Sequence, residues 1–185
     1  MTTFRRPDDA TAPPILPPIW HNRHPNHRLR WVGGQLYVGA QASPTTLICP
    51  KSDVLSQAVP FDAVVSLHSG GEYENMRRKA LAKVQRVVIW PFDDGAPIPA
   101  WLLEAAYCLY RDVRRNPNAR MLVHCAAGLS RSASVAYALL RVTDGLSHVH
   151  ALQRVSVAEY SEYPMPDTLN SARRWVYLKR SGGKL

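Results

Sequence analysis

Long apolar runs and closely spaced cysteines are both missing from this sequence of 185 residues. No stretch approaches the roughly 18 apolar residues of a membrane span, and no apolar segment follows Arg5 and Arg6. We therefore expect neither a transmembrane helix nor a secretory signal. The three cysteines, Cys49, Cys108 and Cys125, are too few and too far apart for a disulfide framework or a CxxC metal site. The sequence thus predicts no metal, no other cofactor and a reducing, cytoplasmic location.

Acidic residues are also scarce. The chain has 14 Asp and Glu against 23 Lys and Arg, which gives a net charge of +9. Such a charge favours acidic partners, but phosphorylated proteins, inositol lipids and RNA all satisfy it. A basic, solvated surface without a specific partner would have the same composition, so charge alone does not choose among these possibilities.

The chain divides near residue 30. Six prolines occur in residues 1–30, which predicts an irregular, proline-rich N-terminal arm before a single domain over 31–185. Within that domain we expect strands at 35–39, 63–68, 85–90 and 121–125, with a further strand considered at 29–32. We expect helices at 43–57, 74–83, 99–115, 131–143, 147–159 and 167–180.

Alternating strands and helices predict an α/β fold. The central sheet should be mostly parallel, contain four to five strands and have helices on both faces. Ligand sites in such sheets lie beyond the carboxyl ends of the strands, and Cys125 follows the expected strand at 121–125. In the helix expected at 99–115, Leu102, Ala106 and Tyr110 share an apolar face, and we expect Cys108 to be buried with them.

The segment His124–Ser132, with the sequence HCAAGLSRS, combines a cysteine with an arginine six residues later. It joins a short apolar strand to a helix through a loop of small residues. In that setting backbone N–H groups converge on one point at a helix N-terminus, where an anion or a thiolate is stabilised. Arg131 can hold two phosphate oxygens with its planar guanidinium. Gly128 is expected to adopt a backbone conformation closed to other residues.

This segment resembles the signature of the cysteine-dependent protein phosphatases, and CAAGLSRS looks most like the atypical dual-specificity branch. The resemblance extends from about Trp31 to about Trp175 and includes the strand segments 36–39 and 63–67. It implies a tyrosine-phosphatase-like fold with Cys125 as the nucleophile. It also implies a phosphate-binding loop made of Ala126, Ala127, Gly128, Leu129, Ser130 and Arg131.

A proton donor for the leaving group is expected on a separate loop. Members of the family place it about thirty residues before the cysteine, commonly as Pro-x-x-Asp. In the sequence WPFDDGAP that pattern selects Asp94, which lies 31 positions before Cys125. Spacing does not settle the register within a loop, so Asp93 is the alternative acid. The chosen carboxyl group would act first as an acid and then as a base.

Two further roles follow from the resemblance. Ser132 is placed to hydrogen-bond the sulfur and help to expel it when the phosphocysteine intermediate breaks down. Helix capping is its alternative role, although Ser130 could cap the helix instead. His124 is expected to hold the shape of the loop through hydrogen bonds instead of acting as a base.

The sequence as a whole predicts a metal-independent phosphatase that hydrolyses phosphotyrosine in proteins. Whether phosphoserine and phosphothreonine are also substrates depends on the depth of the pocket. One alternative is a phosphoinositide or RNA 5′-end phosphatase of the same superfamily. Against the lipid reading, Ala126, Ala127 and Leu129 occupy loop positions where lipid-directed relatives often carry lysine. Nucleic acid is not the expected partner. A phosphate-binding scaffold without activity is the second alternative, and the oligomeric state is left open.

Overall fold

The computed structural model describes residues 29–40, 61–70, 74–82, 84–157 and 164–183. These residues form a five-stranded sheet in the order β1-β2-β5-β3-β4. The strands are β1 (Leu29–Gly33), β2 (Leu36–Gly39), β3 (Ala63–Ser66), β4 (Arg86–Ile89) and β5 (Met121–His124). Only the β1–β2 pair is antiparallel within this sheet, and the other three pairs are parallel. The predicted mostly parallel sheet is confirmed.

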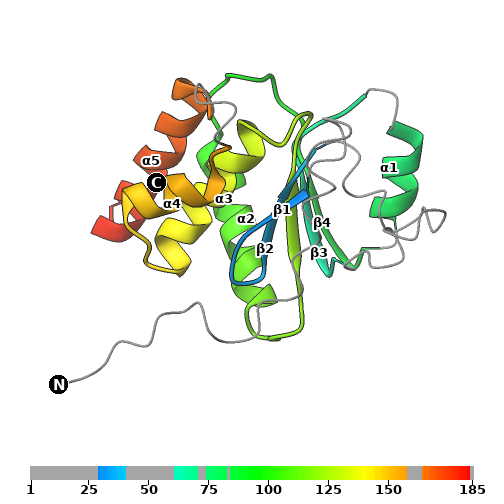
Figure 1. Ribbon diagram of the computed structural model, residues 1–185, viewed down its shortest axis with the longest axis horizontal. Coiled ribbons are helices and arrows are strands. Elements are labelled where there is room, and N and C mark those ends of the chain that lie inside the picture. Colours follow the sequence, from blue (N-terminus) through cyan, green and yellow to red (C-terminus); the bar gives the residue numbers. More distant parts are fainter. Residues whose placement is uncertain (1–28, 41–60, 71–73, 83, 158–163, 184–185) are drawn as a thin grey trace.

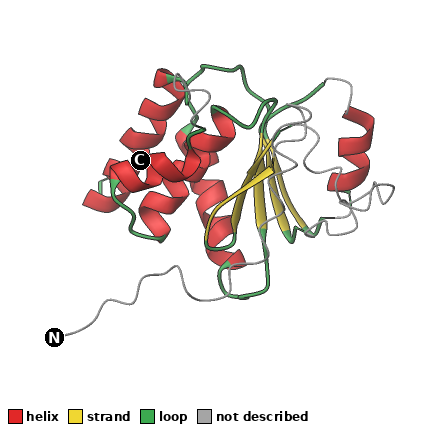
Figure 2. Ribbon diagram, viewed as in Figure 1, coloured by secondary structure: helices red, strands yellow, loops and turns green. Residues whose placement is uncertain are grey.

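Helices lie on both sides of this sheet, as predicted. They are α1 (Glu74–Leu81), α2 (Ala100–Val113), α3 (Arg131–Thr143), α4 (His148–Val155) and α5 (Pro166–Ser181). Figure 1 shows α1 on one face of the sheet and α2 and α3 on the other, with α4 and α5 packed outside them. The separation of α1 from the other helices is also clear when the ribbon is coloured by secondary structure (Figure 2).

The core is built around strands β3 and β5 and helix α3. Every residue of β3 and β5 is buried, and the sequences AVVS and MLVH have the continuous apolar character of strands covered on both faces. The first ten residues of α3, from Arg131 to Leu140, are also all buried. A polar residue at the start of this helix therefore sits inside the protein, and its side chain must find partners there.

Three sequence predictions need correction, and two others fall outside the described residues. The helix expected over 147–159 ends at Val155, because the backbone of Ser156 is extended with φ −74° and ψ 155°. Cys108 is exposed instead of buried. Strand β1 begins at Leu29, so the last two residues assigned to the arm belong to the sheet. The helix expected at 43–57 and arm residues 1–28 lie outside the described residues.

None of the helices in the described ranges is both long and apolar enough to cross a membrane.

Candidate active site

Loops that follow three parallel strands meet at one edge of the sheet. Ser66 is paired with His124 across β3 and β5, and the N–H of Leu67 donates to the carbonyl of His124 at 2.9 Å. The loop after β4 continues beside them, since the N–H of Trp90 donates to the carbonyl of Ser66 at 2.9 Å. Cys125 follows His124 directly. The parallel register therefore brings the segments 67–70, 90–97 and 125–131 together at the carboxyl ends of the strands.

The loop between β5 and α3, residues 125–130, is held close to the end of β2. The N–H of Cys125 donates to the carbonyl of Gly39 at 3.2 Å. Gly128 has φ +74°, and a Cβ atom there would lie 2.9 Å from the carbonyl carbon of Gly39 and 3.1 Å from the nitrogen of Ala40. Both the left-handed backbone and the contact with backbone atoms require glycine. The expectation that Gly128 adopts a conformation closed to other residues is confirmed.

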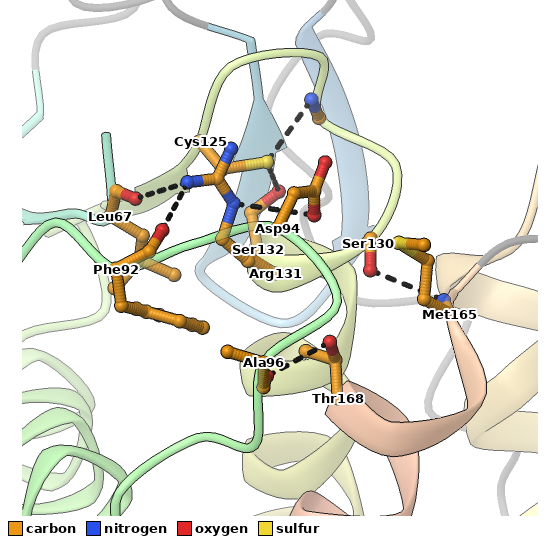
Figure 3. A network of polar contacts seen from close by, with 11 residues as sticks. Leu67, Phe92, Asp94, Ala96, Cys125, Ser130, Arg131, Ser132, Met165 and Thr168 are labelled. Carbon is orange, nitrogen blue, oxygen red and sulfur yellow. Dashed lines mark hydrogen bonds and ion pairs between the residues drawn. The ribbon is translucent and has the colours of Figure 1, made fainter. Parts of the chain in front are cut away.

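The sulfur of Cys125 lies among hydrogen-bonding groups although the residue is only 2% exposed. The N–H of Gly128 donates to its Sγ at 3.3 Å, and the Oγ of Ser132 lies 3.2 Å from the same sulfur. Figure 3 shows both contacts converging on Sγ. A thiolate is stabilised by donors of this kind at the N-terminus of a helix, here α3.

Arg131 turns its guanidinium from the first turn of α3 toward the loops after β3 and β4. Its Nη1 donates to the carbonyls of Leu67 at 3.2 Å and Phe92 at 2.5 Å (Figure 3). The buried Nε has no hydrogen-bond partner among the described residues. It faces the carboxylate of Asp94, whose Oδ1 lies 3.4 Å away. Carbonyls thus fix one side of the guanidinium, and the side that carries Nε faces an anionic group, which in this structure is the Asp94 carboxylate.

Both candidate acids lie on the loop between β4 and α2, and they differ in what they contact. The Asp94 side chain is 46% exposed and pairs with Arg131, which is almost completely buried. Asp93 is also exposed, and its backbone carbonyl accepts a hydrogen bond from Ala96 at 3.2 Å. The structure therefore brings Asp94 beside Arg131, while the described contact of Asp93 shapes the turn.

Helix α5 anchors the loop that carries Asp94. The hydroxyl of Thr168 donates to the carbonyl of Ala96 at 3.1 Å (Figure 3). The Oγ of Ser171 accepts the N–H of Ile98 at 2.8 Å and donates to the carbonyl of Thr168. The position of the loop consequently depends on a helix about seventy residues further along the chain.

The two serines at the start of α3 have different contacts. Ser130 is the N-cap residue, but its side chain makes no capping hydrogen bond within the helix, and its Oγ accepts the N–H of Met165 at 3.2 Å. Ser132 contacts Cys125 as described above. Ser130 therefore joins the loop to the start of α5, and the Oγ of Ser132 lies beside the sulfur.

Arg30 contacts the loop of residues 125–130, hereafter the signature loop, and was not singled out by the sequence analysis. Its Nη2 donates to the carbonyl of Gly128 at 3.0 Å, and its Nη1 donates to the carbonyls of Val155 and Ser156 at 3.0 and 3.3 Å. Arg30 lies on β1, 98 positions before Gly128. No local motif marks a contact across that distance, so the sequence offered no signal for it.

His124 is fully buried on β5, one residue before Cys125. No group of three or more His, Cys, Asp and Glu side chains that could hold a metal ion occurs among the described residues.

Comparison with curated proteins finds relatives that match part of the chain. Protein tyrosine phosphatase type IVA 3 of Mus musculus is 43% identical over 68 residues, which are 36% of this chain and 39% of that protein. Dual specificity protein phosphatase 13B of Mus musculus is 44% identical over 45 residues, 24% of this chain and 23% of that protein. The chain thus spans about two fifths or less of the curated relatives it matches. No protein-family profile matches it.

Solved structures match most of the chain. Human DUSP28 superposes with a TM-score of 0.61 at 22% identity, covering 82% of this chain and 95% of its own. The human tyrosine phosphatase-like serine/threonine/tyrosine-interacting protein gives a TM-score of 0.62 at 17% identity, with coverages of 81% and 97%. A complex of P. aeruginosa TpbA (C132S) with pTyr gives 0.56 at 18%, with coverages of 86% and 92%. The expected tyrosine-phosphatase-like fold is confirmed, and so is the resemblance to tyrosine and dual-specificity phosphatases.

Proposed function

We propose that this protein is a cysteine-dependent phosphatase that hydrolyses phosphate monoesters on proteins. The observation that carries the proposal is the arrangement around Cys125. Its buried sulfur receives the Gly128 N–H and lies next to Ser132. Arg131, the first residue of α3, makes no hydrogen bond through its Nε, which faces only the partly exposed Asp94 carboxylate among the described residues. Nucleophile, anion-binding loop and bidentate cation are the parts that transfer of a phosphoryl group to sulfur requires.

In the proposed first step the Cys125 thiolate attacks phosphorus as the bond from phosphorus to the ester oxygen breaks. The N–H groups of residues 126–131 and the Arg131 guanidinium hold the three equatorial oxygens, where negative charge accumulates. The carboxyl group of Asp94 gives its proton to the departing oxygen. The products are the dephosphorylated alcohol or phenol and a phosphocysteine.

In the second step water replaces the sulfur. The Asp94 carboxylate, now ionised, accepts a proton from the water that attacks phosphorus, and the phosphorus–sulfur bond breaks. The Ser132 hydroxyl, at 3.2 Å from Sγ, donates a hydrogen bond to the leaving thiolate. Inorganic phosphate is released and the resting site is restored. His124, buried beneath the loop, is assigned to holding its shape.

The contact between Asp94 and Arg131 supports Asp94 over Asp93 as the acid. A carboxyl group that reaches Nε of the phosphate-binding arginine also reaches the space above it, where the ester oxygen of a bound substrate would lie. Thr168 and Ser171 hold the loop by its backbone at residues 96 and 98. The side chain of Asp94 is thus carried by an anchored loop, as a positioned general acid requires.

Phosphotyrosine is the proposed main substrate, in a reducing, cytoplasmic compartment where free thiols persist. Cys108 and Cys125 are both free cysteines. Small residues at Ala126 and Ala127 give the loop no extra cation for additional phosphate groups, which supports a protein substrate over a phosphoinositide. If the pocket is shallow, phosphoserine and phosphothreonine would be substrates as well.

The mechanism is tested by turnover of a small aryl phosphate. Cys125→Ser should abolish activity with the fold retained, because a serine hydroxyl does not ionise near neutral pH. Arg131→Lys should be nearly inactive as well, since a point charge cannot replace a planar guanidinium. Activity should persist in a metal chelator and be blocked by vanadate. Substantial turnover by folded Cys125→Ser, or a requirement for added divalent metal, would refute the mechanism.

The substrate class is tested with phosphopeptides, inositol phosphates and RNA carrying a 5′-triphosphate. The proposal expects the highest kcat/KM on phosphotyrosine peptides. A preference for inositol phosphates or RNA ends would replace it by the corresponding phosphatase of the same superfamily. Tight binding of phosphopeptides by the wild-type chain without turnover would instead identify a phosphate-binding scaffold.

A further inference from the structure

A basic hollow lies on the helical side of the protein, where α3, α4 and α5 meet. Figure 1 shows these three helices packed against one another on the side of the sheet opposite α1. The hollow has a volume of about 420 Å³. Its lining comes from all three helices and includes Tyr137, Arg141, His148, Arg173, Tyr177 and Arg180. Three arginines and no carboxylate line it.

The arginines of this hollow have no acidic partner among the residues that the structure describes. Within the described part of the chain, none of Arg141, Arg173 and Arg180 forms an ion pair. Arg141 is held in place because its Nη1 donates to the carbonyl of Leu146 at 2.6 Å, while its buried Nε has no hydrogen-bond partner among the described residues. Arg173 makes a long contact of 3.4 Å with the side chain of Asn170. Guanidinium groups brought together without carboxylates repel one another unless an anion joins them.

Their charges converge near the phenol of Tyr137. Its hydroxyl lies 2.9 Å from Nδ1 of His148, at the edge of the hollow. Burial is the larger effect and raises the pKa of Tyr137, but the positive charges of Arg141, Arg173 and Arg180 all act to lower it. Three side chains from two helices therefore project positive charge onto one region.

We propose that this hollow is a binding site for a compact ligand with clustered phosphate groups. A single phosphate monoester carries about −1.5 to −2 charge at pH 7, which is less than the charge of the three arginines. Several phosphate groups held close together, as in a short polyphosphate or an inositol polyphosphate, match the charge of the three arginines. Each guanidinium can also donate two parallel hydrogen bonds to the oxygens of one phosphate group. Tyr177, which is 71% exposed, adds an aromatic wall at the rim.

The hollow is separate from the candidate active site, although both use α3. Arg131 lies at the N-terminus of that helix and Arg141 ten residues later, which is about 15 Å along the axis at 1.5 Å per residue. The proposal therefore does not rest on the catalytic assignment.

The test measures binding of inositol hexakisphosphate and of tripolyphosphate by calorimetry at a fixed salt concentration. Arg173→Gln with Arg180→Gln should weaken binding at the hollow by at least about tenfold for each arginine removed, because each loses a charge-assisted hydrogen bond. Arg111→Gln with Arg174→Gln removes the same charge from exposed positions outside the hollow and should change affinity by less than about twofold. The probe that binds more tightly shows whether the site prefers phosphate groups carried on an inositol ring or phosphate groups linked in a chain.

A third variant separates this site from the signature loop. In Arg131→Ala, binding at the hollow should persist, and the Arg173→Gln, Arg180→Gln protein should hydrolyse an aryl phosphate at the wild-type rate. An NMR titration of the wild-type chain gives the same information without a variant, with shifts expected at the amides of Arg141, Tyr177 and Ser181. Equal weakening by the control pair would overturn the proposal in favour of a general basic surface. Loss of all binding in folded Arg131→Ala, or shifts confined to residues 125–131, would also overturn it.

Discussion

Replacing Gly128 by alanine changes the candidate site through a single methyl group. The residue has φ +74°, and its carbonyl and N–H are both used, by Arg30 and by the sulfur of Cys125. A Cβ atom would lie 2.9 Å from the carbonyl carbon and 3.0 Å from the carbonyl oxygen of Gly39. These neighbours are backbone atoms of strand β2 and cannot rotate away. The loop must therefore move, or β2 must.

The cost has two parts. A left-handed backbone costs an alanine about 1–2 kcal/mol, and overpacking at a closely packed position adds about 1–3 kcal/mol. Gly128→Ala should thus lower the free energy of unfolding by about 2–5 kcal/mol. If the loop moves, the N–H of Gly128 moves away from the sulfur, and misplacement by about 1 Å can reduce the rate on the order of 10²-fold.

Gly145→Ala is the matched control. Gly145 has φ +68°, but a Cβ atom there would meet nothing within 4 Å. It should therefore lose only the backbone part, about 1–2 kcal/mol, with full activity. Urea denaturation gives the stability of each variant, and turnover of an aryl phosphate gives its activity. If Gly128→Ala were no less stable than Gly145→Ala and equally active, the close approach to β2 would not matter and the argument would be wrong.

Three further predictions concern other parts of the structure. Asp94→Asn should reduce kcat on the order of 10²–10⁴ for phosphoserine peptides, whose leaving group needs a proton, and far less for an acidic phenol ester. Asp93→Asn should keep most activity. If instead Asp93→Asn shows the loss on phosphoserine peptides and Asp94→Asn does not, Asp93 would be the general acid. Arg30→Leu should lower kcat, and it should lower the free energy of unfolding by at least about 1.5–3 kcal/mol, the contribution of one of its three charged hydrogen bonds. Unchanged turnover would show that the signature loop does not need Arg30. Burial raises the pKa of Asp144, with Arg114 opposing. The Asp144 carboxyl group therefore binds its proton more tightly in the folded state than in the unfolded state. The free energy of unfolding of the wild type, relative to that of Asp144→Asn, should increase as the pH falls from neutral toward 3.8, the pKa in the unfolded state. Urea midpoints of both proteins across that range check the sign, and a constant or falling difference would contradict it.

Most of the fold could be predicted from local patterns in the sequence. The strands and helices expected after residue 60 are all present, because the strands are short apolar runs and the helices carry apolar residues at the helical period. Two of the three corrected predictions have local causes as well. Cys108 is two residues from buried Ala106, about 200° around the helix, and so faces solvent. The helix α4 ends at Val155, where no glycine or proline marks a stop.

The sequence by itself determined the signature loop, because its parts are contiguous. A strand, a loop of small residues and a helix are adjacent in the chain, so the spacing of Cys125 and Arg131 already implies their proximity. The need for glycine at position 128 could be inferred in the same way, although the strand that it approaches could not.

Only the tertiary structure decided what reaches this loop from elsewhere. The contact of Asp94 with Arg131 depends on the parallel pairing that brings the loops after β4 and β5 to one edge. The hydrogen bond from Arg30 to Gly128 and the basic hollow between α3, α4 and α5 arise from packing of distant elements. Such contacts have no fixed spacing in the chain. The length of a loop limits which segments can come together, but it does not determine which of their side chains make contact.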